Sequence, residues 1–421
     1  MAFFPRSNDF GLSRYHRAML TAEDNTLLTQ VGPGTPGGEL LRRYWYPVGL
    51  PRDLSESAPT KFIRILGEDL VLFRDRSGRV GLIGDHCPHR GASLLYGRVE
   101  ERGIACAYHG WLYDTAGNCL ETPAEPADSL LHLTVKQRAY PLQKRYGLYW
   151  AYLGPPPAPL LQRYDVAEAG PIKAIGHVPR LDCNWLQVVE NNLDQSHVLI
   201  LHQQTGGGNN AGRGSPVTNT TRGRIDELER IEYNEAPFGI QRRQVHKNGY
   251  DETDLIVFPS TQRIYNRFAV KVPIDDTHTY AYSVVLDLSV DRERDSYHAS
   301  ADVHHDEQNA SIQYYVETIG KTPSDAVHPQ ATYRMDELRL QDFTVLETQG
   351  PIWAREQEHL ATADSGVVLL REVLKREIEK VQRGLDPIGV IRDPEHGPID
   401  TFIDSHFEMA HQFPTSTGTR P

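Results

Sequence analysis

Cys87-Pro88-His89-Arg90 begins the stretch that decides the fold of this chain, and Cys106-Ala107-Tyr108-His109 ends it. Each tetrapeptide offers one thiolate and one imidazole from a tight loop, and residues 90 to 105 separate the two pairs. Two thiolates and two imidazoles can hold a tetrahedral zinc ion. They can equally hold a cluster of two irons and two sulfides, with both cysteines on one iron and both histidines on the other. The donor set alone leaves both alternatives open.

The order of the donors favours the cluster. Common zinc modules pair Cys with Cys and His with His, whereas each loop here is mixed, so two equivalent loops can clamp a cluster from opposite sides. Small residues, Gly91 and Gly110, would let backbone N–H groups approach the bridging sulfides, and Trp111 would close one side. The stretch resembles the Rieske domain of the ring-hydroxylating oxygenases, whose patterns Cys-x-His-Arg-Gly and Cys-x-x-His-Gly-Trp are met at every position. The resemblance implies a [2Fe-2S] cluster bound by Cys87, His89, Cys106 and His109.

Length and composition set broad limits on the chain. The chain has 421 residues, more than one ordinary hydrophobic core organises. We therefore expect two domains, residues 1–158 and 159–421. With 44 Lys and Arg against 56 Asp and Glu, the formal charge is −12, which argues against nucleic acid or an anionic membrane as partner. Cys119 and Cys183 are left as single cysteines rather than a disulfide framework. Because neither a signal peptide nor a membrane-spanning run is evident, we expect a cytoplasmic protein.

Short β-rich runs dominate the first expected domain. Thr21 to Asp24 reads as a capping box that opens a helix toward Val31. The Gly- and Pro-rich residues 32–38 should end that helix, and Glu39 to Tyr44 should form one or two further helical turns. The strands that we expect are 62–66, 70–73 and 80–83 as an antiparallel meander, then 148–153 after a hairpin turn at 115–118. The proline run at residues 154–159 is the expected domain boundary.

The second expected domain combines helices with a sheet. Leu181 to Gln187 should open a helical segment, and polar-alternating runs over residues 224–290 indicate an antiparallel sheet. Val367, Leu370, Leu374, Ile378 and Val381 recur at three and four residues, which predicts an amphipathic helix. Asp364 or Ser365 should cap it and Gly384 should end it. The fold class is therefore α+β, an antiparallel β Rieske domain followed by a helix-on-antiparallel-sheet domain of helix-grip type.

A second set of donors lies in the segment from Glu190 to His202. His197 and His202 follow Asp194, and two histidines with one carboxylate form the facial triad of non-haem Fe(II) oxygenases. On a straight α-helix, side chains five residues apart diverge by about 140°. A π-type turn or a helix break between the histidines is therefore required if they share one metal. Asp194 and His197 do share a face, which makes Asp194 a hydrogen-bond partner of the imidazole rather than a ligand.

This segment resembles the mononuclear iron motif of the same oxygenases, Asn-x-x-Asp-x-x-His-x-x-x-x-His. The match falls on Asn191, Asp194, His197 and His202. The resemblance implies that the histidines bind iron, that Asp194 links this iron to the cluster of a neighbouring subunit, and that Asn191 lies beside the open face. Four carboxylates are candidates for the third ligand: Asp336, Glu337, Asp342 and Glu347. Residues 341–352 resemble the family's ligand-bearing stretch, which implies Asp342, with Glu347 as the next candidate.

The resemblance implies the terminal component of a Rieske non-haem iron oxygenase. Such a protein takes electrons from NAD(P)H through a reductase, with or without a ferredoxin, and activates O₂ at its mononuclear iron. Transfer from head to tail between subunits implies a closed ring, a homotrimer or a homohexamer. The chain looks closest to the phthalate dioxygenase-like branch, which includes aromatic O-demethylases. We therefore expect an aromatic carboxylate or an aryl methyl ether as substrate.

Several alternatives stay open at this point. The reaction can be monooxygenation with loss of formaldehyde or ring dihydroxylation to a cis-diol, and a pure electron carrier or a zinc-stabilised binding protein is the remote alternative. A substrate carboxylate would suit an arginine fork, and the candidates are Arg213, Arg222, Arg242 and Arg243. The loop from Gly206 to Asn210 is either a lid over the entrance or a plain flexible loop.

Overall fold

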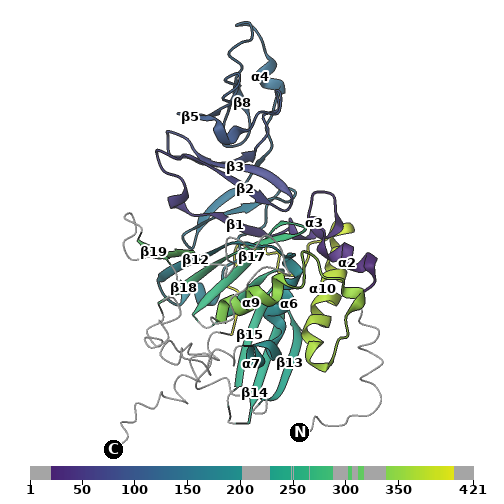
Figure 1. The fold of residues 1–421 in the computed structure, drawn as a ribbon. Helices are drawn as coiled ribbons and strands as arrows, with labels where there is room; N and C mark the ends of the chain where they lie inside the picture. Colours follow the sequence, from purple (N-terminus) through teal and green to yellow (C-terminus); the bar gives the residue numbers. More distant parts are fainter. Residues whose placement is uncertain are drawn as a thin grey trace, which may run out of the picture.

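The computed structural model describes residues 20–201, 228–247, 249, 251–264, 266–287, 302–305, 312–316 and 338–402. These residues form three small β-sheets, a large sheet and a group of helices. The small sheets stack on one end of the large sheet, and helices lie along the side of the large sheet (Figure 1). The predicted α+β class is confirmed. Within the described residues, no helix is both long enough and apolar enough to cross a membrane.

The predicted meander forms one of the small sheets of the first half of the chain. Its strands are β2 (Thr60–Ile65), β3 (Glu68–Arg74) and β4 (Val80–Gly84), and β9 (Ala139–Tyr140) adds to the edge beside β4. Leu66 and Gly67 connect β2 to β3 with φ values of 50° and 72°. Two consecutive residues with positive φ match the right-handed twist of a tight hairpin. All three predicted strands are confirmed.

Two further small sheets complete this half. One consists of β5 (Arg98–Glu100), β6 (Gly103–Ala105), β7 (Leu112–Tyr113) and β8 (Cys119–Glu121). The predicted turn at residues 115–118 joins its last two strands. Together with α4 (Leu131–Thr134), this sheet forms the end of the molecule farthest from the large sheet (Figure 1). The other consists of β1 (Trp45–Gly49), β11 (Leu148–Tyr152) and β10 (Leu142–Arg145). β11 was expected, whereas β1 was not.

The first helices differ in part from the prediction. α2 (Ala22–Thr29) begins as expected, because the Thr21 hydroxyl accepts a hydrogen bond from the N–H of Asp24 at 3.1 Å. α3 (Pro36–Leu41) begins three residues before the expected Glu39, inside the Gly- and Pro-rich run, and ends at Leu41 rather than at Tyr44. Thr35 caps α3 by accepting from the N–H of Gly38, and Pro36 occupies the first helical turn. Proline has a fixed φ that suits this position. Thr35-Pro36 therefore marks the start of a helix.

The large sheet has nine strands in the order β13-β14-β15-β16-β17-β18-β12-β20-β19. Their bounds are β12 (Ile172–Leu181), β13 (Leu228–Ala236), β14 (Gly239–His246), β15 (Asp251–Val257), β16 (Thr261–Ile264), β17 (Arg267–Asp275), β18 (His278–Leu286), β19 (Asp302–His305) and β20 (Gln313–Val316). Neighbouring strands are antiparallel except β12 and β20, which are parallel. The predicted antiparallel sheet is therefore confirmed but for one pair. Leu181 ends β12 rather than opening a helix.

A layer of helices covers the large sheet. Its members are α6 (Trp185–Leu193), α7 (Gln195–Ile200), α9 (Leu338–Glu347) and α10 (Ser365–Gln382), and a short helix, α5 (Asp165–Glu168), lies before β12. The side chain of Asn184 caps α6 by accepting from the N–H of Leu186. α10 is the predicted amphipathic helix: Asp364 precedes it, and Gly384 follows it with a φ of 76°. The five apolar residues that predicted α10 are all buried.

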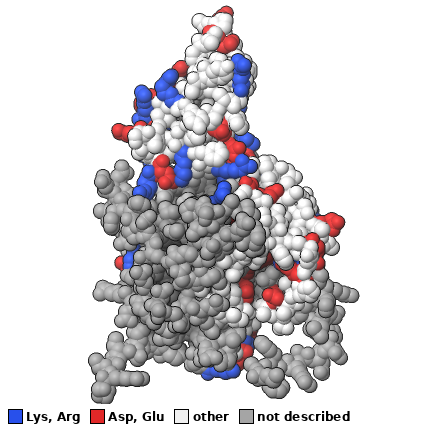
Figure 2. Space-filling model, viewed as in Figure 1, with Lys and Arg blue, Asp and Glu red and all other residues white. Residues whose placement is uncertain are grey.

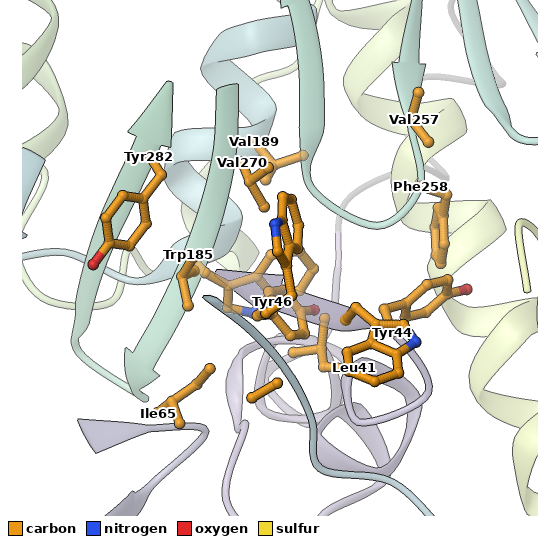
Figure 3. Close-up of a cluster of buried hydrophobic side chains, with 14 of the residues drawn as sticks. Leu41, Tyr44, Tyr46, Ile65, Trp185, Val189, Val257, Phe258, Val270 and Tyr282 are labelled. Carbon is orange, nitrogen blue, oxygen red and sulfur yellow. The ribbon is translucent and has the colours of Figure 1, made fainter. Parts of the chain in front are cut away.

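A continuous apolar core joins the two halves of the chain. It contains Leu41, Tyr44, Tyr46 and Ile65 from the first half and Trp185, Val189, Val257, Phe258, Val270 and Tyr282 from the second (Figure 3). Tyr46 and Trp185 are each 1% exposed. Complete burial of a large apolar side chain stabilises a fold by roughly 1.5–3 kcal/mol. The proline run after β11 has no helix or strand, and the division at residue 158 stays a prediction.

Candidate metal centres

The two loops with mixed Cys and His have the same backbone conformation. The carbonyl of Cys87 accepts from the N–H of Gly91 at 2.8 Å, and that of Cys106 accepts from Gly110 at 2.9 Å. In both loops the cysteine N–H donates to the carbonyl five residues further on, at 2.9 Å. Gly91 and Gly110 have φ values of 75° and 73°, a region that favours glycine. The glycines in the motif are therefore required by the shape of the loops.

The side chains of these loops divide into a buried pair and an outer pair. Cys87 and Cys106 are 2% and 4% exposed, whereas His89 is exposed and His109 is half-buried. The imidazole rings of His89 and His109 lie 4.6 Å apart between centroids, and His89 stacks on Trp111 at 4.3 Å. Two inner thiolates and two outer imidazoles are the donor arrangement that a Rieske cluster requires. The residues present therefore fit the group.

Burial shifts the pKa values of two side chains in these loops, Cys87 and His109. Burial raises the pKa of the Cys87 thiol, although the hydrogen bond with Tyr113 opposes the rise. A thiol that coordinates a metal is deprotonated outright, so cluster binding would overcome this shift. Partial desolvation and the neighbouring His89 and Arg90 charges lower the pKa of His109. A neutral imidazole is the form that binds a metal.

Asp194 ends one helix and begins the next. Its backbone is extended, with a φ of −73° and a ψ of 109°, so α6 stops and α7 starts in a new direction. Its carboxylate accepts from the N–H of Ser196 at 2.8 Å and lies 3.5 Å from Nδ1 of His197. Burial opposes its charge, but the hydrogen bonds from His197 and from backbone N–H groups lower the pKa of Asp194. The carboxylate is thus placed to orient the imidazole.

The other nitrogen of His197 faces α9. Nε2 lies 3.6 Å from Oδ1 of Asp342 and 3.4 Å from Nδ2 of Asn191. Atoms that bind a common metal at about 2.0–2.2 Å in adjacent positions lie about 3 Å apart, so His197 and Asp342 fit two ligands of one ion with a small adjustment. His202 lies outside the described residues. Among the residues that are described, no three His, Cys, Asp or Glu side chains converge on one ion.

The helix break was expected between His197 and His202. The structure shows a break before His197, at Asp194, and it also ends α7 at Ile200, which lies between the two histidines. The relation between the two histidines therefore stays a prediction. The physical reason for the observed break is the cap: Asp194 uses its side chain to satisfy the first N–H groups of α7, which requires a non-helical backbone.

The other candidate carboxylates have different surroundings. Glu347 is 6% exposed and accepts from the N–H of Asp182 at 2.9 Å, which connects the end of α9 to the residue after β12. Asp336 and Glu337 lie outside the described residues. The geometry thus favours Asp342 over Glu347 as the group beside His197.

A buried ion-pair network supports the helix with Asn191. Glu190 accepts from Arg355 at 2.7 Å and from Arg371 at 2.7 Å. Burial disfavours the charged form of Glu190, but the two guanidinium groups more than compensate and lower its pKa. Arg371 also binds Glu358. These residues therefore fix α6 against α10 and the segment after α9.

The arginines considered for a carboxylate fork are already engaged. Arg242 is buried, with hydrogen bonds to Asp254 at 2.5 Å and to the carbonyl of Asn192 at 2.9 Å. Arg243 pairs with Asp251 at 2.6 Å. Arg213, Arg222 and the Gly206 to Asn210 loop lie outside the described residues.

One residue beside the cluster loops was missed in the sequence. Tyr113 lies against Cys87, and only its position shortly after Trp111 hinted at a role.

Comparison with known proteins agrees with this geometry. Residues 44–141 match the family described as Rieske [2Fe-2S] domain, and residues 172–400 match the family described as LigXa C-terminal domain like. The chain belongs to the Rieske non-haem iron oxygenases and is an oxygenase (alpha) subunit. Members of this family carry a Rieske cluster and a mononuclear iron.

Two curated relatives cover most of the chain. The oxygenase subunit of 5,5'-dehydrodivanillate O-demethylase from Sphingobium sp. (strain NBRC 103272 / SYK-6) is 34% identical over 89% of this chain and 84% of its own length. The oxygenase subunit of phthalate 4,5-dioxygenase from Pseudomonas putida is 32% identical over 88% of this chain and 89% of its own. Dicamba monooxygenase bound to dicamba has the same fold, with a TM-score of 0.54 and 18% identity over 82% of this chain and 99% of its own.

Proposed function

We propose that this protein oxidises an aromatic carboxylate or an aryl methyl ether, with O₂ and with electrons that a reductase takes from NAD(P)H. The observation that carries the proposal is the distance of 3.6 Å between Nε2 of His197 and Oδ1 of Asp342. These residues lie on α7 and α9, two helices that cover the large sheet. The names of the relatives support the substrate class, because they include an O-demethylase and dioxygenases of aromatic acids.

The cluster is assigned to the two matching loops. Cys87 and Cys106 are proposed to hold the inner iron, and His89 and His109 the outer one, because only the imidazoles reach the surface. Trp111 restricts the ring of His89 by stacking on it, with an angle of 5° between the planes. An outer imidazole held in this way presents its edge to an electron donor or to a neighbouring subunit. A reductase, or a ferredoxin between the reductase and this protein, is the expected donor.

The mononuclear iron is assigned to His197, His202 and Asp342. When bound, such an iron supplies O₂ activation at coordination positions that the three ligands leave open. Asp194 orients His197 by accepting from Nδ1, which leaves Nε2 to face the metal. Asn191 lies on the Nε2 side and can hydrogen-bond a group at the open positions.

The arrangement of elements favours electron transfer between subunits. The β5–β8 sheet carries the loop of Cys106 and His109. This sheet lies at the end of the molecule that is farthest from α7 and α9 (Figure 1). A closed ring, a homotrimer or a stack of two trimers, would bring this end of one subunit to Asp194 of the next. In the view of Figure 2, basic and acidic side chains are interspersed over this part of the surface. Cys119 and Cys183, the two cysteines not assigned to the cluster, are buried and form no disulfide, which suits a reducing cytoplasm.

O-demethylation and ring dihydroxylation remain the two candidate outcomes, because both kinds of relative are about equally similar. In O-demethylation, one atom of O₂ enters a methyl C–H bond and leaves with that carbon as formaldehyde, the other becomes water, the ether oxygen stays in the phenol, and two electrons and two protons are consumed. In dihydroxylation, both atoms of O₂ enter the ring with the same number of electrons and protons. The products therefore distinguish the reactions.

The proposal is tested by metal content and turnover. Protein purified without oxygen should contain iron and acid-labile sulfide in a ratio of three to two, as expected for one cluster and one further iron. Aerobic turnover with a compatible reductase is then measured over a panel of methoxylated and carboxylated aromatics, with formaldehyde and diol as readouts. Cluster absorbance without mononuclear iron would identify an electron carrier, and a colourless zinc protein would refute the oxygenase assignment.

A further inference from the structure

The break between α6 and α7 is held by hydrogen bonds from the large sheet. The hydroxyl of Tyr233 on β13 donates to the carbonyl of Leu193 at 2.5 Å, and Nη1 of Arg242 on β14 donates to the carbonyl of Asn192 at 2.9 Å. The last four carbonyls of an α-helix have no partner within the helix. Tyr233 and Arg242 therefore bind the two residues that end α6, directly before Asp194.

Tyr233 and Arg242 reach the break from one face of the sheet. They lie directly opposite each other on the antiparallel strands β13 and β14, and Asp254 lies opposite Arg242 on β15. Directly opposite residues in an antiparallel pair share a face. The break lies over these strands (Figure 1). A row of three side chains across three strands thus faces the end of α6.

Arg242 is anchored on its other side by Asp254. Nη2 of Arg242 donates to Oδ2 of Asp254 at 2.5 Å, and the two side chains are 4% and 3% exposed. Burial opposes the charge of Arg242, but Asp254 and the other neighbouring groups more than compensate and raise the pKa of Arg242. A hydrogen bond from a charged donor is about twice as strong as one between neutral groups. The carbonyl of Asn192 is therefore bound by a charged donor in a fixed position.

Tyr233 is fixed by α10. A Cβ atom at Gly366 would lie 2.6–2.8 Å from three ring atoms of Tyr233, so the ring packs closely on α10 only because residue 366 has no side chain. Burial raises the pKa of Tyr233 to about 12, and the charge of Asp194 adds to the rise although Arg242 opposes it. The hydroxyl therefore keeps its proton and acts as a donor near the Asp194 carboxylate.

The direction of α7 sets the geometry of the proposed iron ligands. Asp194 lies 3.5 Å from Nδ1 of His197, and Nε2 of the same ring lies 3.6 Å from Oδ1 of Asp342. Because Asp342 is on α9, a rotation of α7 against α6 would change the position of His197 relative to Asp342. The bonds of Tyr233 and Arg242 with the end of α6 oppose such a rotation.

We propose that Tyr233 and Arg242 are positioning residues for the mononuclear iron: they hold the end of α6 so that Asp194 and His197 keep the geometry that metal binding and electron transfer require. This inference rests on the proposed function. Both side chains act through the backbone of α6, so neither is expected to bind iron or substrate. Arg242, a candidate for a carboxylate fork from the sequence, thus has a different role in the site.

The test removes the Tyr233 hydroxyl and keeps its ring. Tyr233→Phe takes one donor from the carbonyl of Leu193, and the matched control Tyr44→Phe removes a buried hydroxyl that donates to the carbonyl of Ile388 at 2.6 Å. Loss of a buried hydrogen bond should lower the stability of both variants in urea to a similar extent. The electron paramagnetic resonance spectrum of the nitric oxide adduct reports the ligand geometry of the mononuclear iron. This spectrum should change in Tyr233→Phe and match the wild type in Tyr44→Phe.

Turnover should show the same contrast. With an accepted substrate, kcat of Tyr233→Phe should fall by about five- to a hundredfold, the range expected when a buried carbonyl loses its donor. KM should stay within about twofold, and Tyr44→Phe should change neither constant. Arg242→Lys keeps the charge beside Asp254 but replaces the planar fork with a single nitrogen, so it should show the same spectral change. It replaces Tyr233→Phe in the comparison if that variant does not fold.

A measurement that needs neither iron nor substrate separates the possible failures. The N–H of Ser196 donates to the Asp194 carboxylate at 2.8 Å, and its hydrogen exchange should be at least about fivefold faster in Tyr233→Phe but unchanged in Tyr44→Phe. An unchanged spectrum in Tyr233→Phe, or equal changes in the two tyrosine variants, would overturn the positioning role. If the wild type binds no mononuclear iron or oxidises no aromatic compound, the proposed function fails, and the exchange result alone decides whether Tyr233 holds the break.

Discussion

The hydroxyl oxygen of Tyr113 lies 3.3 Å from Sγ of Cys87. Tyr113 is fully buried on β7, and Cys87 belongs to the loop that follows β4. Burial first, and then the sulfur, raise the pKa of Tyr113, so the phenol keeps its proton. It can therefore donate a hydrogen bond to a thiolate ligand and stabilise the extra negative charge of a reduced cluster.

Removal of this hydrogen bond should make the cluster harder to reduce. Hydrogen bonds to ligand sulfurs raise the reduction potential of iron–sulfur clusters. A bond worth about 1 kcal/mol corresponds to about 40 mV for one electron, so Tyr113→Phe should lower the potential by about this amount. Potentiometric titration of the cluster absorbance measures the shift. Tyr96→Phe, at a position that is 76% exposed, is the control, and an equal shift in both variants would show that the hydrogen bond is not the cause.

Two carboxylates on α9 should differ in their effect on iron. Asp342→Asn should lose most of the mononuclear iron, since a neutral amide is a weaker ligand for iron than a carboxylate, while the cluster absorbance stays. Glu347→Gln should keep its iron because that side chain instead accepts from the N–H of Asp182. Iron and sulfide analysis of both variants gives the answer. Iron loss in Glu347→Gln with retention in Asp342→Asn would reverse the assignment.

The sequence predicted those parts of the fold that depend on local chemistry. The Thr21 cap, the β2–β4 meander and the α10 helix each follow from the residues that form them. The metal loops were equally predictable, because their glycines have the positive φ values that the loop shape requires. β1 was missed because its five residues are all buried, so no alternation of polar and apolar residues marks a strand.

The candidate iron site was only partly predictable, since its residues come together through long-range packing. His197 and Asp342 are far apart in sequence, and only the packing of α9 over β12 and β18 places them 3.6 Å apart. Periodicity carries no information about such a pairing, and the resemblance to known oxygenases selected Asp342.

Loss of Arg355 should destabilise the protein strongly. Arg355 is 0% exposed and binds Glu190 at 2.7 Å, so Arg355→Met leaves a buried carboxylate with one partner fewer. Breaking a buried ion pair costs about 3–5 kcal/mol in the free energy of unfolding. Urea denaturation measures the change. Arg383→Met breaks an exposed pair with Glu379 and should cost less than about 1 kcal/mol. Similar losses in the two variants would contradict the structural role of Arg355.

Asp194→Asn should separate metal binding from coupled turnover. The substitution keeps the size of the side chain and can still cap α7, so both the cluster and the mononuclear iron should remain. Turnover should fall by at least about a hundredfold if the carboxylate connects the iron to the cluster of the next subunit, as a lost charge-assisted hydrogen bond allows. Rapid mixing of the reduced protein with substrate and O₂ measures the reaction. Wild-type turnover with full metal content would refute the connection.

His177 should make the stability of the protein fall in mild acid. Its ring stacks on Tyr282 at 4.5 Å, and burial first, then the charge of Lys61, lowers its pKa to about 4. In the unfolded chain the pKa is about 6.5, so below that pH the unfolded state binds a proton that the folded state does not. The stability that His177 contributes is therefore complete above pH 6.5. It decreases as the pH falls toward 4, by about 1.4 kcal/mol at about pH 5.5.

His177→Phe keeps the stacking and removes the titration. Its unfolding free energy, measured in urea at about pH 7.5 and 5.5, should decrease less than that of the wild type, and an identical decrease would exclude His177 as the cause.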